Sequence, residues 1–82
     1  MIMSNAEIFE KLTEIFRDVF DDEEIAISAS TTAADIDGWD SLTHITLLAA
    51  VEDEFDVKFS MKAVQHLQNV GELAALIAEG LA

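Results

Sequence analysis

The chain has 82 residues, enough for one small domain, which we place over residues 1–82. A domain of this size buries only about 60% of the surface that its unfolded form exposes, so it lacks the depth for a catalytic cleft and we do not expect an enzyme. Four basic and seventeen acidic side chains give a net charge of −13. That charge disfavours nucleic acid and anionic membranes, and it favours partners with basic surfaces.

Missing residue types and short apolar runs exclude further classes of protein and site. The chain has no cysteine, which rules out disulfides and Cys-based zinc sites. Its apolar runs, such as Leu47 to Val51, are far shorter than a membrane span, and Met1-Ile2-Met3 lacks the basic region of a signal peptide. We therefore expect a cytoplasmic monomer without membrane insertion.

Helical periodicity, the absence of proline and the lack of strand-like alternation predict an all-α fold. We expect a four-helix bundle of three main helices and one short helix, with a long loop between the first and second helices. Ser4 followed by Glu7 is typical of a capping box at the first helix. That helix is predicted to end at about Phe20, and the residues that form its apolar face are Ile8, Leu12, Ile15, Phe16 and Val19.

The segment from Asp21 to Asp40 loses this periodicity and is rich in acidic, Ser, Thr and Ala residues. Connections between bundle helices usually have about two to eight residues, so a loop of this length indicates a function or disorder. Three isoleucines are predicted to anchor it in the core: Ile25, Ile27 and Ile36. The indole of Trp39 is expected to pack over the loop, because it buries much apolar area.

The second predicted helix, Leu42 to about Phe55, carries two apolar stripes. At about 100° per residue one stripe contains Leu47, Leu48, Val51 and Phe55, and a second one contains Leu42, Ile45 and Ala49. Glu52, Asp53 and Thr46 edge the second stripe. It is either an exposed docking surface framed by acids or a surface that packs beneath the loop or the third helix.

Two more helices complete the expected bundle. A short third helix is predicted near Met61 to Leu67. Asn69 with Glu72 is typical of a further capping box, which opens the fourth helix. The residues that this last helix is expected to bury are Val70, Leu73, Ile77 and Leu81.

Ser41 stands where the second helix begins, beside Asp40. The simplest interpretation of both residues is as N-caps, which accept hydrogen bonds from the first backbone N–H groups. The free N–H groups of a helix start also favour a phosphate. His44 lies nearby, but the Gly-x-Ser-x-Gly elbow of many hydrolases is missing, so a catalytic triad is not indicated.

No metal site is predicted. Asp35 to Asp40 is similar to a calcium loop, but its glycine falls at the fourth position instead of the sixth, and Thr46 replaces the bidentate glutamate. His44 and His66 lie on different predicted helices, without an assured carboxylate partner.

Three motifs in this layout resemble those of the acyl carrier protein family: Asp40-Ser41-Leu42, Glu52-Asp53-Glu54-Phe55 and Asn69-Val70-Gly71-Glu72-Leu73. The resemblance implies a four-helix bundle in which Ser41 carries phosphopantetheine, attached from coenzyme A by a Mg²⁺-dependent phosphopantetheinyl transferase. The thiol of this arm would carry acyl groups as thioesters. Implied partners are a loading ligase or transacylase and acyl-processing enzymes such as a ketosynthase, with basic docking patches.

The same resemblance assigns roles to residues around Ser41. Asp40 and Leu42 would be recognised by the transferase. Downstream enzymes would bind a second set of residues: Ile45, Ala49, Glu52 and Asp53.

Two departures from the fatty-acid type bear on the pathway. Thr43, His44 and Thr46 stand where acids are common, and Trp39 replaces a small residue. We therefore expect a stand-alone carrier in a specialised lipid, polyketide or related pathway. The alternatives are an aminoacyl or peptidyl carrier, an unmodified acidic helical interaction module, and a small hydrolase that uses Ser41.

Overall fold

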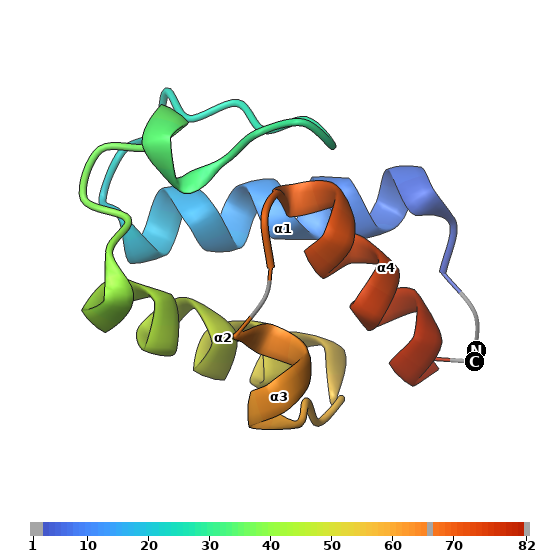
Figure 1. The fold of residues 1–82 in the computed structure, drawn as a ribbon. Coiled ribbons are helices and arrows are strands. Elements are labelled where there is room, and N and C mark those ends of the chain that lie inside the picture. The colour runs from blue at the N-terminus through green and yellow to red at the C-terminus, as the bar shows by residue number, and fades with distance from the viewer. Residues whose placement is uncertain (1–2, 66, 82) are drawn as a thin grey trace.

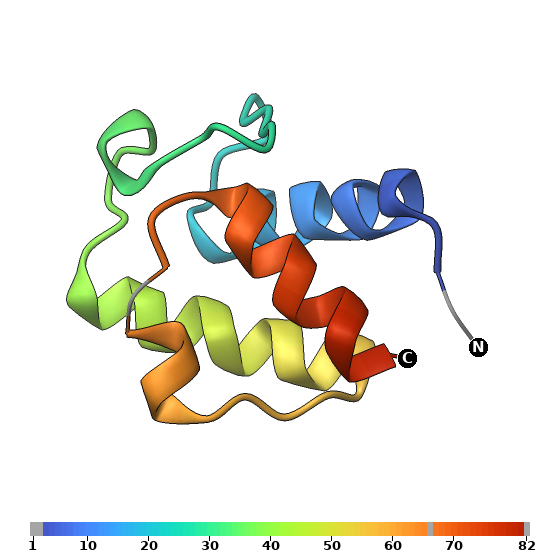
Figure 2. The ribbon, with the colours of Figure 1, turned by 45° about the vertical axis from the view of Figure 1, so that its right-hand side comes forward.

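The computed structural model describes residues 3–65 and 67–81. Over these ranges the chain forms four α-helices, one 3₁₀ turn and no strand, which confirms the predicted all-α fold with its long loop. The elements are α1 (Asn5–Val19), η1 (Ala33–Asp35), α2 (Ser41–Phe55), α3 (Met61–Val64) and α4 (Val70–Leu81). Helix α1 packs against both α2 and α4. The long loop lies across α1 from α2 and reaches the start of α4 (Figures 1 and 2).

Helix α1 begins with the predicted capping box. The Ser4 hydroxyl accepts a hydrogen bond from the Glu7 N–H at 3.2 Å, and the Glu7 carboxylate accepts one from the Ser4 N–H at 3.0 Å. Two orphan donors of the helix start are thereby satisfied. The helix ends at Val19, one residue before the predicted end, and its core-facing residues are Ile8, Leu12, Ile15 and Phe16.

The long loop is ordered by apolar and polar contacts with the helices. Ile25 and Ile36 are buried and Ile27 packs against the same core, which confirms the three predicted anchors. The Arg17 side chain donates from Nε to the carbonyl of Ile25 at 2.9 Å, joining α1 to the loop. The turn η1 within this loop was not expected, because three residues carry no periodicity that a sequence pattern could show.

The loop also completes the start of α4. The N–H groups of Val70 and Gly71 donate to the carbonyls of Thr31 and Ala29, both at 2.9 Å. The first N–H groups of a helix have no partner within the helix, so these loop carbonyls take that place. A Cβ atom on Gly71 would lie 2.8 Å from the Ala29 oxygen, which explains why a glycine stands at this close approach.

Only one of the two hydrogen bonds of the capping box predicted at Asn69 and Glu72 forms. The Asn69 side chain accepts from the Glu72 N–H at 2.9 Å, as expected. The Glu72 carboxylate accepts from the N–H of Gln68 at 3.0 Å and not from that of Asn69. Along α4, Val70, Leu73 and Ile77 are buried, whereas Leu81 is only partly buried.

Helix α3 is shorter than predicted. It covers Met61 to Val64, begins at an N-cap in which the Ser60 hydroxyl accepts from Ala63, and does not extend to Leu67. Leu67 instead packs against the core from a non-helical position, which competes with continuation of the helix. His66 lies outside the described residues. No helix in the described part of the chain is long and apolar enough to cross a bilayer.

Candidate functional site

Ser41 is the first helical residue of α2 and not its cap. The N-cap is Asp40, whose carboxylate accepts from the N–H groups of Leu42 and Thr43, each at 3.0 Å. The interpretation of Ser41 as a cap is therefore wrong, and the helix starts one residue earlier than predicted. Ser41 is exposed, and across residues 3–65 and 67–81 no hydrogen bond engages its hydroxyl. The hydroxyl is thus accessible from solvent.

The cap sets the electrostatics around Ser41. The Thr43 N–H, more than any other group, holds the pKa of Asp40 below its usual value by stabilising the charged carboxylate; the Leu42 N–H adds to this and partial desolvation opposes it. The N–H groups of Leu42 and Thr43 are therefore occupied. Among residues 3–65 and 67–81 the N–H of Ser41 has no acceptor, so the expectation that the start of α2 favours a phosphate now depends on this donor and on the helix dipole.

Thr43 fastens the start of α2 to the loop. Its hydroxyl donates to the carbonyl of Gly38 at 2.7 Å and accepts from the Asp40 N–H at 2.8 Å. Gly38 has φ of +87°, a left-handed conformation that glycine adopts without strain. These contacts hold the residues on either side of Ser41 in fixed positions.

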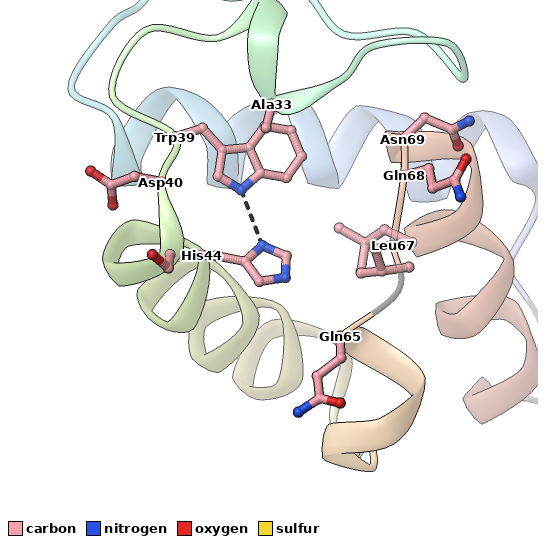
Figure 3. A pocket seen from close by; sticks show the side chains of 10 residues that line it. Ala33, Trp39, Asp40, His44, Gln65, Leu67, Gln68 and Asn69 are labelled. Carbon is pink, nitrogen blue, oxygen red and sulfur yellow. Dashed lines mark hydrogen bonds between the residues drawn. The ribbon is translucent and has the colours of Figure 1, made fainter.

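Trp39 and His44 form a pair that the sequence analysis missed. The indole Nε1–H donates to His44 Nδ1 at 3.0 Å, and the two rings stack with centroids 5.9 Å apart (Figure 3). The indole also meets Phe16 edge-on at 5.3 Å, which confirms that Trp39 packs. Because indole only donates, Nδ1 is the acceptor and the proton of the neutral imidazole is on Nε2. No periodic signal could have revealed a pair that spans a helix cap.

A pocket of about 270 Å³ opens beside Ser41. In Figure 3 the Trp39 and His44 rings form one side and Leu67 lies across from them, with Gln65, Gln68 and Asn69 on the α3–α4 side. The complete lining is Ala33, Trp39, Asp40, Ser41, His44, Gln65, Leu67, Gln68, Asn69 and Leu73. Of these residues, only Asp40 and Ser41 were candidate site residues in the sequence.

The two stripes of α2 face opposite environments. Leu47, Val51 and Phe55 are buried, and Leu48 is partly buried. Leu42 and Ile45 are 76% and 63% exposed, and Ala49 is also exposed, so the alternative that this stripe packs beneath the loop or the third helix is wrong. Sequence analysis did not single out Met61, which is 69% exposed at the start of α3.

The two acids at the edge of the exposed stripe differ. Asp53 is exposed. Glu52 is half-buried, and its carboxylate accepts from the N–H of Phe59 at 2.9 Å, which ties α2 to the segment before α3. Elsewhere in residues 3–65 and 67–81 there is no group of three or more His, Cys, Asp or Glu side chains arranged to hold a metal ion.

Comparison with known proteins connects this geometry to a family. The family model described as "Phosphopantetheine attachment site" matches residues 10–77. The chain belongs to the acyl carrier protein family. Relatives named acyl carrier protein include one from Picosynechococcus, 36% identical over 92% of this chain and 93% of its own length, and one from Petrotoga mobilis, 35% identical over 96% and 93%. Another, from Caulobacter vibrioides, is 30% identical over 90% and 95%.

A solved structure supports the same assignment. The solution NMR structure of a holo acyl carrier protein from Geobacter metallireducens has a TM-score of 0.84 and 45% sequence identity, over 89% of this chain and 84% of that one. Acyl carrier proteins are carriers without catalytic activity of their own, and phosphopantetheine is the cofactor of the family. This assignment excludes the hydrolase and the unmodified interaction module. The family also implies a phosphopantetheinyl transferase and acyl-processing enzymes as partners.

Proposed function

We propose that Ser41 is the residue that carries the phosphopantetheine arm. The observation that supports this is the exposed, unengaged Ser41 hydroxyl, presented at a helix start that Asp40 and Thr43 fix and beside an open pocket. These residues fit the group, because a phosphodiester needs an accessible hydroxyl and its arm needs space. The arm supplies a thiol that holds acyl groups as thioesters. The chain itself contributes a fixed anchoring point and a surface for recognition.

Docking of partners rests on the exposed stripe of α2. An apolar strip is formed by Leu42, Ile45 and Ala49, and Asp53 gives it an acidic edge. The whole chain has a formal net charge of −13. Electrostatic attraction accelerates encounter with basic partner surfaces, and the small apolar area keeps the contacts reversible. We assign Asp40 and Leu42 to the transferase contact and Ile45, Ala49, Glu52 and Asp53 to later enzymes. For Glu52 the hydrogen bond to Phe59 adds a structural role.

The pathway proposal is a stand-alone carrier in specialised lipid, polyketide or related biosynthesis, with aminoacyl or peptidyl transfer as the alternative. Thr43 and His44, which replace acids common in the fatty-acid type, bond to Gly38 and Trp39 and so serve the loop. Because Thr43 and His44 stand in place of these acids, the start of α2 is less acidic than in the fatty-acid type. A carrier with this surface should be a poor substrate for enzymes that dock on acids there.

Intact mass measures the attachment directly. Apo protein is incubated with coenzyme A, Mg²⁺ and a broad-specificity transferase, and the mass should rise by one phosphopantetheine group. Ser41→Ala should show no increase. Ser60→Ala, which changes another exposed serine at the start of a helix, should be modified like the native chain. Modification of Ser41→Ala, or none of the native chain, would refute the assignment.

A panel of purified loading enzymes distinguishes the pathways. The holo protein is offered to acyl and aminoacyl ligases, transacylases and a fatty-acid ketosynthase, and loaded species are counted by mass. We expect a specialised ligase or transacylase to load it faster than the fatty-acid enzymes do. Efficient use in fatty-acid elongation alone would contradict the specialised pathway while leaving Ser41 unaffected.

A further inference from the structure

The ring of His44 joins three parts of the molecule near Ser41. It belongs to the first turn of α2, and its Nδ1 accepts from the indole of Trp39, the residue at the end of the loop, at 3.0 Å (Figure 3). Its Nε2 lies 3.4 Å from the Val64 carbonyl of α3. The indole in turn packs edge-on against Phe16 of α1. His44 therefore fastens the end of the loop to α2, one helical turn after Ser41.

The bond between Trp39 and His44 requires a neutral imidazole. An indole N–H can only donate, so Nδ1 must keep a free electron pair to accept from it. An imidazolium carries a proton on both ring nitrogens and accepts no hydrogen bond. Protonation of His44 would therefore set two N–H donors against each other where one bond now exists. Imidazole is also the side chain whose charge ordinarily changes between about pH 5 and 8.

Protonation changes the contacts on one side of the ring only. Nε2 carries a proton in both charge states, so its contact with the Val64 carbonyl is the same in both. On the loop side, Nδ1 is the one acceptor that the indole N–H has among residues 3–65 and 67–81. Without it, the Trp39 side chain would be held by packing against Phe16 and Phe20 alone.

Few charged groups face the His44 ring. The charged side chains of the neighbouring elements are Asp35 and Asp37 of the loop, Lys62 of α3 and Glu72 of α4. None of these four lines the pocket beside the ring; Asp40 does, and its carboxylate caps α2. Residues 41–51 carry no charge apart from this ring, and no ion pair involves it within the described part of the chain. His66 lies outside the described residues. A change in the charge of His44 therefore acts directly on the indole bond.

We propose that the bond between Trp39 and His44 is a pH-sensitive switch. Neutral His44 holds the indole and fixes the end of the loop beside Ser41. Protonated His44 releases the indole, and the segment just before Ser41 becomes mobile. The protein does not unfold, because the buried isoleucines of the loop and the cap of α2 keep their contacts. Since Ser41 follows this segment directly, its presentation to a partner enzyme depends on pH.

Solvent exchange of the indole N–H measures the release. The chain has one tryptophan and two histidines, so the indole signal is unique and a His66→Gln background leaves His44 as the sole imidazole. In the apo protein, NMR follows the exchange rate and the His44 ring signals from about pH 8 to about pH 5. Each rate is divided by that of His44→Asn, whose side-chain oxygen accepts without titrating, which cancels the ordinary pH dependence of exchange. We expect this ratio to rise about fivefold as His44 is protonated, the factor that a typical internal hydrogen bond contributes.

Two comparisons identify the group that controls the exchange. His44→Phe keeps a ring but has no acceptor, so its ratio should be high at every pH. With His44 present, the midpoint of the exchange change should coincide with that of the ring signals, a comparison that does not depend on the folding of a variant. An exchange ratio that stays constant while the ring titrates would overturn the proposal. A change with a different midpoint would do so too, because another group would then be responsible.

The link to Ser41 is tested by the attachment reaction, and this part of the inference rests on the attachment proposed above. The kcat/KM of the transferase for the His44 protein is divided by that for His44→Asn at each pH, which cancels the pH dependence of the transferase itself. We expect this quotient to fall at least about twofold on protonation, because an anchored site loses less conformational freedom on binding. An unchanged quotient would disprove the link to Ser41. If no form gains mass, the attachment proposal fails instead, while indole exchange still decides whether the switch exists.

Discussion

The two apolar stripes of α2 have similar residues and opposite roles. Leu47 and Val51 are fully buried, whereas Leu42 and Ile45, on the same helix, are 76% and 63% exposed. Burying a leucine or isoleucine side chain contributes about 1.5–3 kcal/mol, and the exposed stripe forgoes most of this stabilisation. The docking role proposed for this stripe would account for the exposure of these residues.

The boundary between the stripes is equally informative. Glu52 lies at that boundary and bonds to the backbone of Phe59, while its neighbour Asp53 is exposed. Two adjacent acids therefore differ in their contribution to the fold. Substitutions on each stripe and at this boundary should separate stability from partner recognition.

The largest effect is expected on the buried stripe. Leu47→Ala should lower the free energy of unfolding by about 2–5 kcal/mol, because it removes buried methyl groups and leaves a cavity. Urea denaturation followed by circular dichroism measures this change. Leu42→Ala is the matched control and should change stability by no more than about 0.5 kcal/mol. Equal losses in the two variants would abolish the distinction between the stripes.

A smaller effect is expected at the boundary. Glu52→Ala should cost about 1–2 kcal/mol, since the Phe59 N–H loses a charged acceptor at a partly buried site. Glu52→Gln keeps an acceptor oxygen and should recover most of that loss. Thermal unfolding of both variants and of Asp53→Ala tests this. A loss for Asp53→Ala as large as that for Glu52→Ala would mean that the Phe59 bond is not the cause.

For a substitution on the exposed stripe we expect a change in loading by partner enzymes and not in folding stability. Ile45→Ala should leave stability within about 0.5 kcal/mol, because the side chain is mostly exposed and alanine favours helix. Loading by a downstream enzyme should lose about fivefold in kcat/KM if Ile45 is a docking contact worth about 1 kcal/mol. Ala75→Ser, at an exposed position on α4, serves as the control. Unchanged loading by every partner tested would mean that Ile45 is not part of the docking surface.

The smallest effect concerns the cap of α2. The pKa of Asp40 is lowered in the folded state, chiefly by the Thr43 N–H, so the cap stabilises the fold above the ordinary value of 3.8 and loses this contribution as the pH falls below it. Asp40→Asn also caps but does not titrate. The stability difference between native and variant should therefore shrink as pH falls from 5 toward 3, which acid-dependent thermal melts would show. A difference that does not change with pH would mean that the carboxylate charge is irrelevant to the cap.

The accuracy of the sequence predictions followed the strength of the local signal. The capping box at Ser4 and the buried stripe of α1 were predicted correctly, because each depends on residues three or four apart on one helix. The predicted end of α3 at Leu67 was wrong, since the packing of Leu67 against the core outweighed the local sequence pattern. The cap at α2 was assigned to Ser41 as well as to Asp40, two neighbours with similar capping preference that only backbone geometry separates.

The sequence by itself determined the helical class, the anchoring isoleucines of the loop and the motifs around Ser41, because periodicity and short spacing are local properties. Tertiary structure alone decided which stripe of α2 is exposed, how the loop carbonyls complete α4, and that Trp39 and His44 meet over a pocket beside Ser41. These features join segments that are distant in sequence or separated by a turn. Their geometry depends on how the helices pack around α1, and no pattern within one helix contains that information.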